Sequence, residues 1–179
     1  MEIEVVRLGH RMVRDYRVST HVCLVARALG ARRIWIEGHV DQTVQKSVGA
    51  IQTEWGGEFE IQFVLGMRKK VLEMKRSGFC IVHLTMYGTP LPDAENDLRQ
   101  KEKIAILIGS QKVPAEYYRL ADYNISVSQQ PQSEIGALAI TLDHLQEGRE
   151  LAAGQRQVNA KKSVEATARG KKLRRSGVL

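Results

Sequence analysis

The sequence has few residues of the kinds that cross-link or stiffen a chain, and it lacks any long apolar run. Of its 179 residues only two are cysteine and four are proline, and aromatic residues make up 6%. Two cysteines cannot build a disulfide framework. No apolar run approaches the roughly 18 residues that a membrane-spanning helix needs, and no signal-peptide pattern follows Met1. We therefore expect a reduced, cytoplasmic protein without a membrane segment.

Several motifs that mark common chemistries are also missing. The sequence has no G-x-x-x-x-G-K-[ST] loop and no G-x-G-x-x-G after a predicted strand, which disfavours nucleoside triphosphates and dinucleotides as ligands. It has no G-x-S-x-G, so a hydrolase of that type is not indicated. Cys23 and Cys80 lie in apolar stretches without C-x-x-C or H-x-x-x-H spacing. We interpret both as core residues and expect no metal site.

The positive charge is concentrated at one end of the chain. The formal net charge is +7, yet residues 1–150 hold 19 basic and 19 acidic side chains. Residues 151–179 hold eight basic residues and one acid, Glu165, so this segment carries the whole excess. We divide the chain into a domain over 1–150 and a basic extension over 151–179. Such a segment is typical of a nucleic-acid contact or of a solvated tail, and composition does not separate the two.

Apolar runs of strand length alternate with helix-periodic stretches along residues 1–150. Strands are predicted at 3–8, 33–37, 58–64, 79–85, 103–108 and 123–127. Helices are predicted from a cap at Ser19 or Thr20 to Gly30, after Asp41, at 67–76, at 93–100, and from a cap near Ser133 to Gly148. This alternation is typical of an α/β domain whose mostly parallel sheet is flanked by helices.

Three of the predicted strands end in loops suited to a ligand site. Leu84 precedes a loop with glycine and proline, the run 103–108 leads directly into Gly109, and the strand at 123–127 leads into a polar loop before a helix that begins near Ser133 and Glu134. A glycine or proline after a strand usually makes only a turn. Ligands of open parallel sheets bind outside the carboxyl ends of the strands, so these three ends could converge on one pocket.

The segment from Arg7 to Arg33 is rich in arginine. It contains seven arginines and one acid, Asp15. Four of the arginines fall in the predicted loop between the first strand and the first helix: Arg7, Arg11, Arg14 and Arg17. Arginine suits bidentate phosphate contacts, and loops often hold functional residues. A solvated loop with an Arg–Asp15 pair is the alternative. His10 and His21 are the candidate proton-transfer residues, although a lone histidine is more often structural.

Four blocks of the sequence closely resemble one family of RNA-modifying enzymes. The blocks are RLGHR…RDYRVSTHVCLVARALGA, VHLTMYG, ILIGSQKVP with LADYN, and QPQSEIGALAITLDHL, in this order over about residues 3–148. They resemble the archaeal tRNA (cytidine-56) 2′-O-ribose methyltransferases of the SPOUT superfamily. The resemblance implies an α/β fold with a deep trefoil knot near its C-terminal end. It also implies S-adenosylmethionine bound in a bent form in the knot, and a homodimer with two such sites at its interface.

The resemblance assigns the three strand ends to the cofactor. The implied contacts are Leu84 at the first end, Gly109, Ser110, Gln111, Lys112 and Val113 at the second, and Val127, Ser128, Gln129, Gln130, Pro131, Gln132, Ser133 and Glu134 at the third. The sequence departs from the family pattern in two places. The usual G-A-E-K-V-P is G-S-Q-K-V-P here, and the usual G-N-Q-P-H-S-E is S-Q-Q-P-Q-S-E, which replaces a glycine by Ser128 and a histidine by Gln132.

The implied reaction is attack of the ribose 2′-hydroxyl of cytidine 56, in the tRNA T loop, on the sulfonium methyl of S-adenosylmethionine. Such a transfer holds the two atoms about 3–3.5 Å apart and removes the hydroxyl proton, and it needs no metal. By similarity, Arg17 or Arg14 would position the ribose and phosphate, with His21 as the rival proton acceptor. Arg7 and Arg11 would hold the RNA backbone, together with Arg169, Lys171 and Lys172 of the basic extension.

Two other functions fit the same residues. A non-catalytic RNA-binding module would keep the arginine segment and the basic extension without binding the methyl donor. A base methyltransferase of the same superfamily would modify a guanine nitrogen. Donor binding distinguishes an enzyme from the first alternative, and mapping the methyl group to ribose or base distinguishes it from the second.

Overall fold

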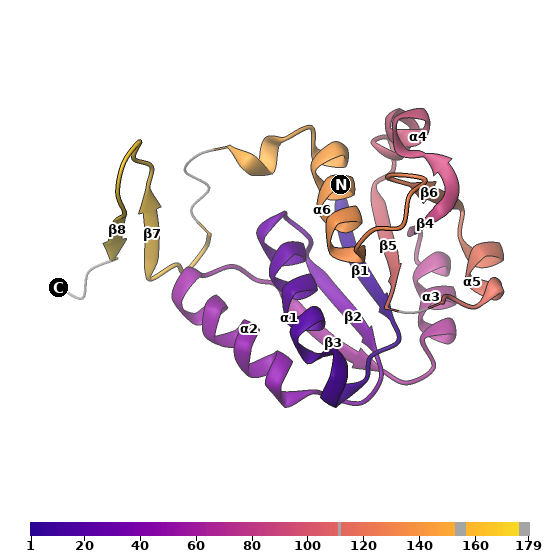
Figure 1. Ribbon diagram of the computed structural model, residues 1–179, viewed down its shortest axis with the longest axis horizontal. Helices are drawn as coiled ribbons and strands as arrows, with labels where there is room; N and C mark the ends of the chain where they lie inside the picture. Colours follow the sequence, from indigo (N-terminus) through magenta and orange to yellow (C-terminus); the bar gives the residue numbers. More distant parts are fainter. Residues whose placement is uncertain (111, 153–156, 176–179) are drawn as a thin grey trace.

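A computed structural model describes residues 1–110, 112–152 and 157–175, and it shows a sheet between two layers of helices (Figure 1). The strands of this sheet are β1 (Glu2–Leu8), β2 (Arg33–Glu37), β3 (Glu60–Val64), β4 (Cys80–Pro90), β5 (Lys103–Gly109) and β6 (Tyr123–Ser126). The helices are α1 (Met12–Ala28), α2 (Gln42–Trp55), α3 (Met67–Arg76), α4 (Leu91–Leu98), α5 (Ala115–Leu120) and α6 (Glu134–Gln146), followed by a short 3-10 helix, η1 (Arg149–Leu151).

The six strands form one parallel sheet in the order β3-β2-β1-β5-β4-β6. The chain builds outward from β1 to β3, then crosses to the other side of β1 to add the remaining strands. The order therefore reverses between β1 and β5, at the centre of the sheet, and their carboxyl ends lie side by side, with Leu8 paired to Gly109. A ligand crevice is expected at such a reversal. The predicted α/β architecture with a mostly parallel sheet is confirmed.

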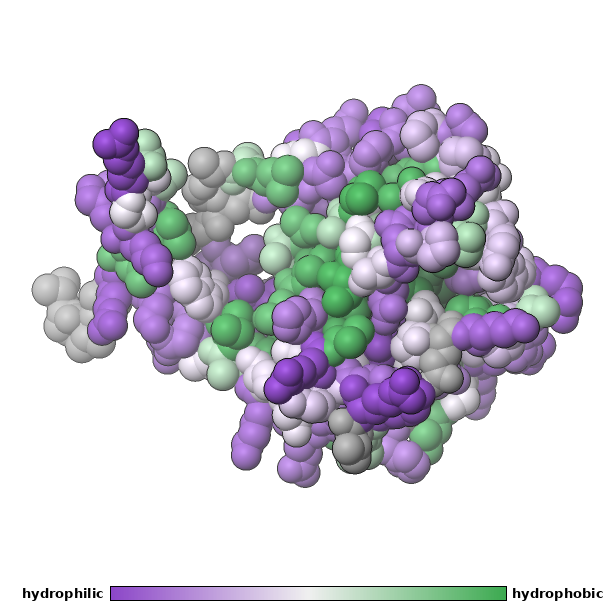
Figure 2. All heavy atoms as spheres, viewed as in Figure 1, coloured by the Kyte–Doolittle hydropathy of each residue, from purple (hydrophilic) through white to green (hydrophobic). Residues whose placement is uncertain are grey.

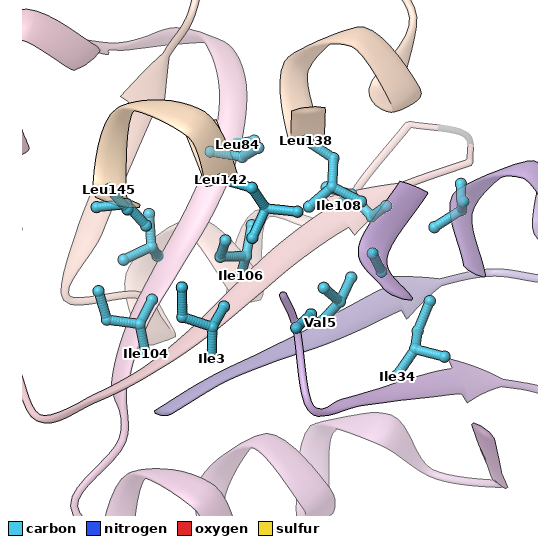
Figure 3. Packing of buried hydrophobic residues seen from close by; sticks show 14 of the residues in the cluster. Ile3, Val5, Ile34, Leu84, Ile104, Ile106, Ile108, Leu138, Leu142 and Leu145 are labelled. Carbon is cyan, nitrogen blue, oxygen red and sulfur yellow. The ribbon is translucent and has the colours of Figure 1, made fainter. Parts of the chain in front are cut away.

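Each face of the sheet packs against its own set of helices, because side chains alternate between faces along a strand. On one face, α1, α2, α4 and α6 form the larger cluster of buried residues. Figure 3 shows the leucines of α6 over the isoleucines of β5 and the start of β1: Leu138, Leu142 and Leu145 lie over Ile104, Ile106, Ile108, Ile3 and Val5. On the other face, α3 and Tyr117 of α5 cover Val6, Leu8 and Leu107.

The first helix starts earlier than the sequence predicts. It begins at Met12 with Arg11 as its N-cap, so the predicted cap at Ser19 or Thr20 is wrong. The carboxylate of Asp15 accepts hydrogen bonds from the Arg11 backbone amide and guanidinium, at 3.1 Å each, and this supports the extra turns. The predicted cap near Ser133 is confirmed, and α2 begins after Asp41 as predicted, with the Asp41 side chain as its cap.

The chain of β4 passes close beside β6 beyond an irregularity. Ile125 of β6 pairs with Leu84 before the irregularity and with Thr89 after it. Gly88 lies against the backbone of Asn124 and Ile125, and a Cβ atom at this position would lie closer than 3.0 Å to three of their atoms. Only glycine fits this close approach of the two strands without displacing the backbone.

The basic extension contains a structure that the sequence analysis did not predict. Strands β7 (Lys162–Glu165) and β8 (Lys172–Arg175) pair antiparallel as a separate two-stranded hairpin, which stands beside α2 in Figure 1. Two backbone hydrogen bonds attach the preceding chain to the end of α2: Gly57 N to Val158 O at 2.8 Å and Lys161 N to Glu54 O at 3.0 Å. The side chain of Lys162 also forms an ion pair with Glu54.

Among the described residues, no helix combines the length and apolar character needed to cross a membrane.

Candidate functional site

A cavity of about 290 Å³ opens beside the irregularity in β4 and the carboxyl ends of β5 and β6. It is lined by the middle of β4 at its irregularity (Leu84, Thr85, Met86), the end of β5 (Ile108, Gly109), the loop after β6 (Val127, Ser128, Gln130, Pro131, Gln132, Ser133) and the start of α6 (Glu134, Ala137). The three strand ends identified in the sequence therefore do meet at one pocket. Its volume is near the lower end of the roughly 300–1,000 Å³ range of small-molecule sites.

Local hydrogen bonds shape the polar wall of this cavity. The Ser128 hydroxyl accepts the backbone N–H of Gln130 at 3.2 Å, and the Ser133 hydroxyl accepts that of Ile135 at 3.2 Å to cap α6. Ser128 is not among the residues with positive φ, so its backbone conformation does not require the glycine that the family pattern carries. Replacement of that glycine by serine is therefore compatible with the shape of the loop.

Some predicted cofactor residues lie outside the lining of the cavity. Ser110 directs its hydroxyl to the carbonyl oxygen of Gly9, at 2.5 Å, and Val113 packs against the core cluster beneath α3. Lys112 and Gln129 are exposed and do not line the cavity, and Gln111 lies outside the described residues. Four lining residues were missed: Thr85, Met86, Ile108 and Ala137. Each is within three residues of a predicted position, so extending the predicted strand ends would have found them.

A buried network supports the β4 wall of the cavity from behind. His83, which is 1% exposed, shares a hydrogen bond with the Asn124 side chain at 2.9 Å. The His83 ring lies edge-on to the ring of Tyr118, whose hydroxyl is 3.1 Å from the Thr85 hydroxyl. Burial lowers the pKa of His83 below its usual value, with an opposing contribution from Asn124. The cavity wall at Thr85 is thus fixed to α5 and β6.

The structure corrects the prediction for Arg7. This residue lies in β1 rather than in a loop, and it is 0% exposed. Its guanidinium donates to the Gly9 carbonyl oxygen at 3.0 Å and forms an ion pair with Glu134 at 3.3 Å. Period-two alternation after Val5 turns it toward α1 and α6, into the interior. A guanidinium enclosed in this way does not present itself to an RNA phosphate, so the predicted backbone contact is wrong.

The three other arginines assigned to the loop, Arg11, Arg14 and Arg17, lie at the start of α1, so the prediction of a loop is wrong for them. Arg14 and Arg17 are exposed on the helix, as is His21 one turn after Arg17. None of the three lines the cavity. Arg11 pairs with Asp15 at 3.1 Å, which is the Arg–Asp15 pair considered as an alternative. Hydrogen bonds from Arg11 hold the pKa of Asp15 below its usual value, against the effect of burial.

His10 has a structural environment. Its ring is fully buried between Ser19, 2.8 Å from Nδ1, and Asp41, 3.1 Å from Nε2. Because Asp41 also caps α2, this chain of hydrogen bonds ties the turn after β1 to both helices.

A second hollow, of about 920 Å³, separates the hairpin from the body of the molecule. It is lined by residues of α1, α2 and the hairpin, among them Leu24, Ile51, Trp55, Lys162, Val164 and Arg175. The predicted RNA-binding residues Arg169, Lys171 and Lys172 are exposed in the hairpin and its connecting turn, with Lys172 paired to Glu165 at 2.9 Å. None of the predicted cofactor residues lines this hollow.

The fold defines the class of protein. The AdoMet-bound rRNA methyltransferase from Sinorhizobium meliloti superposes with a TM-score of 0.62 at 19% identity, covering 83% of this chain and 57% of that protein. The TrmH/SpoU tRNA modifying enzyme of A. aeolicus gives a TM-score of 0.57 at 18% identity, covering 84% of this chain and 75% of that protein. This chain thus spans between about half and three quarters of the length of these structures. At such identities the similarity shows a shared fold, that of the SpoU/TrmH methyltransferases.

The sequence comparisons identify the family within this class. A family model described as tRNA ribose 2′-O-methyltransferase, aTrm56, matches residues 55–174. Proteins named tRNA (cytidine(56)-2′-O)-methyltransferase from Nitrosopumilus maritimus and Cenarchaeum symbiosum are 46% and 48% identical, over 97% and 96% of this chain and 96% and 95% of those proteins. The chain belongs to the tRNA ribose 2′-O-methyltransferase family, and the resemblance noted in the sequence is confirmed.

Proposed function

We propose that this protein transfers a methyl group from S-adenosylmethionine to the ribose 2′-hydroxyl of cytidine 56 in tRNA. The observation that carries the proposal is the cavity beside the irregularity in β4 and the ends of β5 and β6, because it brings together the loops that the family resemblance assigns to the cofactor. Family membership supplies the substrate class.

The residues around the cavity fit the methyl donor in kind. Leu84, Ile108 and Val127 offer an apolar surface for an adenine ring, and the loop after β6 offers backbone groups and short polar side chains. The carboxylate of Glu134, which is 21% exposed at the start of α6, suits a cationic ligand. The bound donor supplies an electrophilic methyl group on a sulfonium, which leaves as a neutral thioether.

Within this proposal, the arginines of α1 act on the RNA side of the reaction. Arg17, or Arg14 three residues before it, holds the phosphate and ribose of the target nucleotide and favours the alkoxide form of the 2′-hydroxyl. A guanidinium is a poor base because it holds its proton at neutral pH. His21, exposed one turn further along, is the group suited to accept the hydroxyl proton.

We further propose that the protein acts as a homodimer in which α1 of one subunit completes the cavity of the other. Arg14, Arg17 and His21 are exposed and do not line the cavity of their own chain. Hydrophobic residues gather at the surface over α1 and α6 in the centre of Figure 2. Val18 of α1 and Ile140 of α6 are 38% and 42% exposed. A dimer through these helices would bury them and bring the arginines of one subunit toward the cavity of its partner.

Two features support the proposal that the chain is knotted near its C-terminal end. The segment after Leu84 lies in backbone contact with β6 at Gly88, and the buried leucines of α6 share one core cluster with residues of α4 and β5. We propose that residues 85–109 close the loop through which the later chain passes. Because knots are rare in proteins, the backbone contact at Gly88 does not imply one by itself, and the inference rests on the family resemblance as well.

We also propose that the two parts of the chain, divided at residue 150, have different roles in the reaction. Residues 1–150 form the methyltransferase domain, and the basic extension, through its hairpin, contacts the tRNA backbone with Arg169, Lys171 and Lys172. Because its substrate is tRNA, we place the protein in the cytoplasm.

The test is a labelled-methyl assay on unmodified tRNA, with the modified nucleotide mapped by nuclease digestion and mass spectrometry. Methyl transfer to the ribose at position 56 is the expected result. A methyl group found on guanine nitrogen would support the base methyltransferase instead. Absence of S-adenosylmethionine binding at millimolar concentration, measured by calorimetry, would support the non-catalytic RNA-binding module.

A further inference from the structure

Arg7 occupies an unusual place for an arginine. It lies in β1, a central strand of the sheet, where it pairs with Ile36 of β2 on one side and Ile108 of β5 on the other. Its side chain is 1% exposed. Burying a guanidinium is costly unless charged partners and hydrogen bonds compensate for the lost water. The described residues provide no partner for its Nε atom, so the compensation rests on the two terminal nitrogens.

Those two nitrogens contact two different parts of the site. Nη2 donates to Oε1 of Glu134, which lines the cavity at the start of α6, at 3.3 Å. Nη1 donates to the carbonyl oxygen of Gly9, in the turn that leads into α1, at 3.0 Å. The same carbonyl oxygen accepts the Ser110 hydroxyl from the end of β5, at 2.5 Å. One buried side chain therefore joins the cavity wall, the turn before α1 and the end of the central strands.

We infer that Arg7 is a positioning residue for methyl-donor binding, acting through Glu134. The inference rests on the proposed function and adds a residue that lines no part of the cavity. Among the described residues, the ion pair of the Glu134 carboxylate is the one with Arg7, which holds it against the sheet. Without this partner the carboxylate is free to turn into the cavity or toward solvent. The position of the Glu134 carboxylate in the cavity wall would then vary, and the methyl donor would bind less tightly.

The experiment is a double-mutant cycle on donor affinity, measured by calorimetry with S-adenosylmethionine. The variants are Arg7→Met, Arg7→Lys, Glu134→Gln and the two combinations. Arg33→Met is the matched control, since Arg33 of β2 also pairs with carboxylates, Glu4 and Glu60, but away from the cavity. Thermal unfolding of every variant separates general stability from donor binding.

We expect Arg7→Met to weaken donor binding about tenfold and Arg7→Lys about threefold, because lysine keeps the charge but does not span both acceptors. In the Glu134→Gln background, either change should weaken binding by less than about twofold further, because the partner through which Arg7 acts is gone. Arg33→Met should lower the melting temperature and leave donor affinity unchanged. The KM for donor should rise in the Arg7 variants, and the KM for tRNA should not.

Two results would overturn the inference. One is a donor affinity within twofold of the unaltered protein in Arg7→Met, with only the melting temperature lowered. The other is full multiplication of the Arg7 and Glu134 effects in the double variants. If Arg7→Met does not fold, Arg7→Lys with Glu134→Gln completes the same cycle. Failure of the proposed function is a separate result, because it would appear as absent donor binding or absent transfer in the unaltered protein.

Discussion

The α/β domain and the C-terminal hairpin differ in how much apolar surface their strands bury. In the domain, β1 and β5 are covered on both faces, and Val5, Val6, Ile106 and Leu107 are all 0% exposed. In the hairpin, the cross-strand pair Val164 and Leu173 remains 65% and 58% exposed. An isolated two-stranded hairpin is marginally stable in water. The comparison shows that the hairpin depends on its attachment, whereas the domain has a core of its own.

That attachment is concentrated at the end of α2. Gly56 ends this helix with a φ of 72°, and a Cβ atom there would lie closer than 3.0 Å to Val158 and Ala160. Arg27 of α1 donates to the Gly56 carbonyl oxygen from the other side. The chain that precedes the hairpin therefore packs closely against the domain at the end of α2. Beyond this contact, the charged side chains of β8 are exposed to solvent. In our proposal, the domain binds the methyl donor and the target nucleotide, and the hairpin adds contacts to the tRNA backbone.

The largest expected effect comes from the domain, at Arg17. If the α1 arginine stabilises the developing alkoxide, Arg17→Ala should reduce methyl transfer by at least about 100-fold. Donor affinity should not change, since in the proposal Arg17 contacts the phosphate and ribose of the target nucleotide and not the methyl donor. Single-turnover transfer and calorimetry measure the two quantities, with Arg76→Ala on the exposed side of α3 as the control. If Arg14→Ala shows this loss and Arg17→Ala does not, the role belongs to Arg14.

A second change in the domain should affect the donor alone. Gly109 lines the cavity at the end of β5, so the side chain of Gly109→Val would occupy space proposed for the donor. We expect donor affinity to fall more than about 30-fold, while tRNA affinity stays within twofold. Gly49→Ala is the control, because a Cβ at this exposed helical position meets nothing within 4 Å. Unchanged donor binding in Gly109→Val would remove the cavity from the proposal.

A change confined to the hairpin should have the converse effect. Replacing Arg169, Lys171 and Lys172 together by glutamine removes three positive charges from exposed positions. We expect tRNA affinity to fall about tenfold at low salt, and the slope of log K against log salt to decrease by up to about 2 to 3. Donor affinity should be unchanged. Replacement of Arg119, Arg76 and Lys69, exposed on α5 and α3, controls for net charge. An equal loss in both triple variants would mean that hairpin position is irrelevant.

The same comparison explains what the sequence could and could not predict. In the domain, the spacing of apolar residues and the positions of turn residues located all six strands. This worked because each strand is a short apolar run that is visible in the local sequence. Leu84, Gly109 and the loop to Glu134 were recognised as strand ends that converge, and the cavity lies there. Parallel topology brings such ends together whatever the details of the side chains.

Two kinds of information were outside the reach of sequence pattern. The environment of Arg7 depends on a contact with Glu134, 127 positions later in the chain, so the predicted strand at 3–8 did not reveal that this arginine is buried and paired. The hairpin was hidden because its strands are four residues each, bear many charges and bury little apolar surface. Its cross-strand pairing of Glu165 with Lys172 leaves no hydrophobic period to detect.

The smallest expected effect also distinguishes the two regions, since it depends on pH. Residues 157–175 contain no histidine, whereas His83 is buried behind the cavity wall in β4. Burial lowers the pKa of His83 in the folded protein below the usual 6.5 of the unfolded chain. As pH falls through about 6.5, the unfolded chain therefore takes up a proton that the folded protein does not. The free energy of unfolding should then decrease, by at most about 1.4 kcal/mol per pH unit from this residue.

This dependence can be isolated by substitution. His83→Gln keeps a side-chain donor for Asn124 and removes the titrating group. Chemical unfolding at pH 8 and pH 5 should show a smaller loss of stability in His83→Gln than in the unaltered protein. The other histidines of the domain contribute equally to both proteins and cancel in the difference. Protein truncated after residue 160 should show the same His83-dependent loss, because the hairpin contributes no histidine. Equal losses in His83→Gln and the unaltered protein would show that burial of His83 does not control this titration.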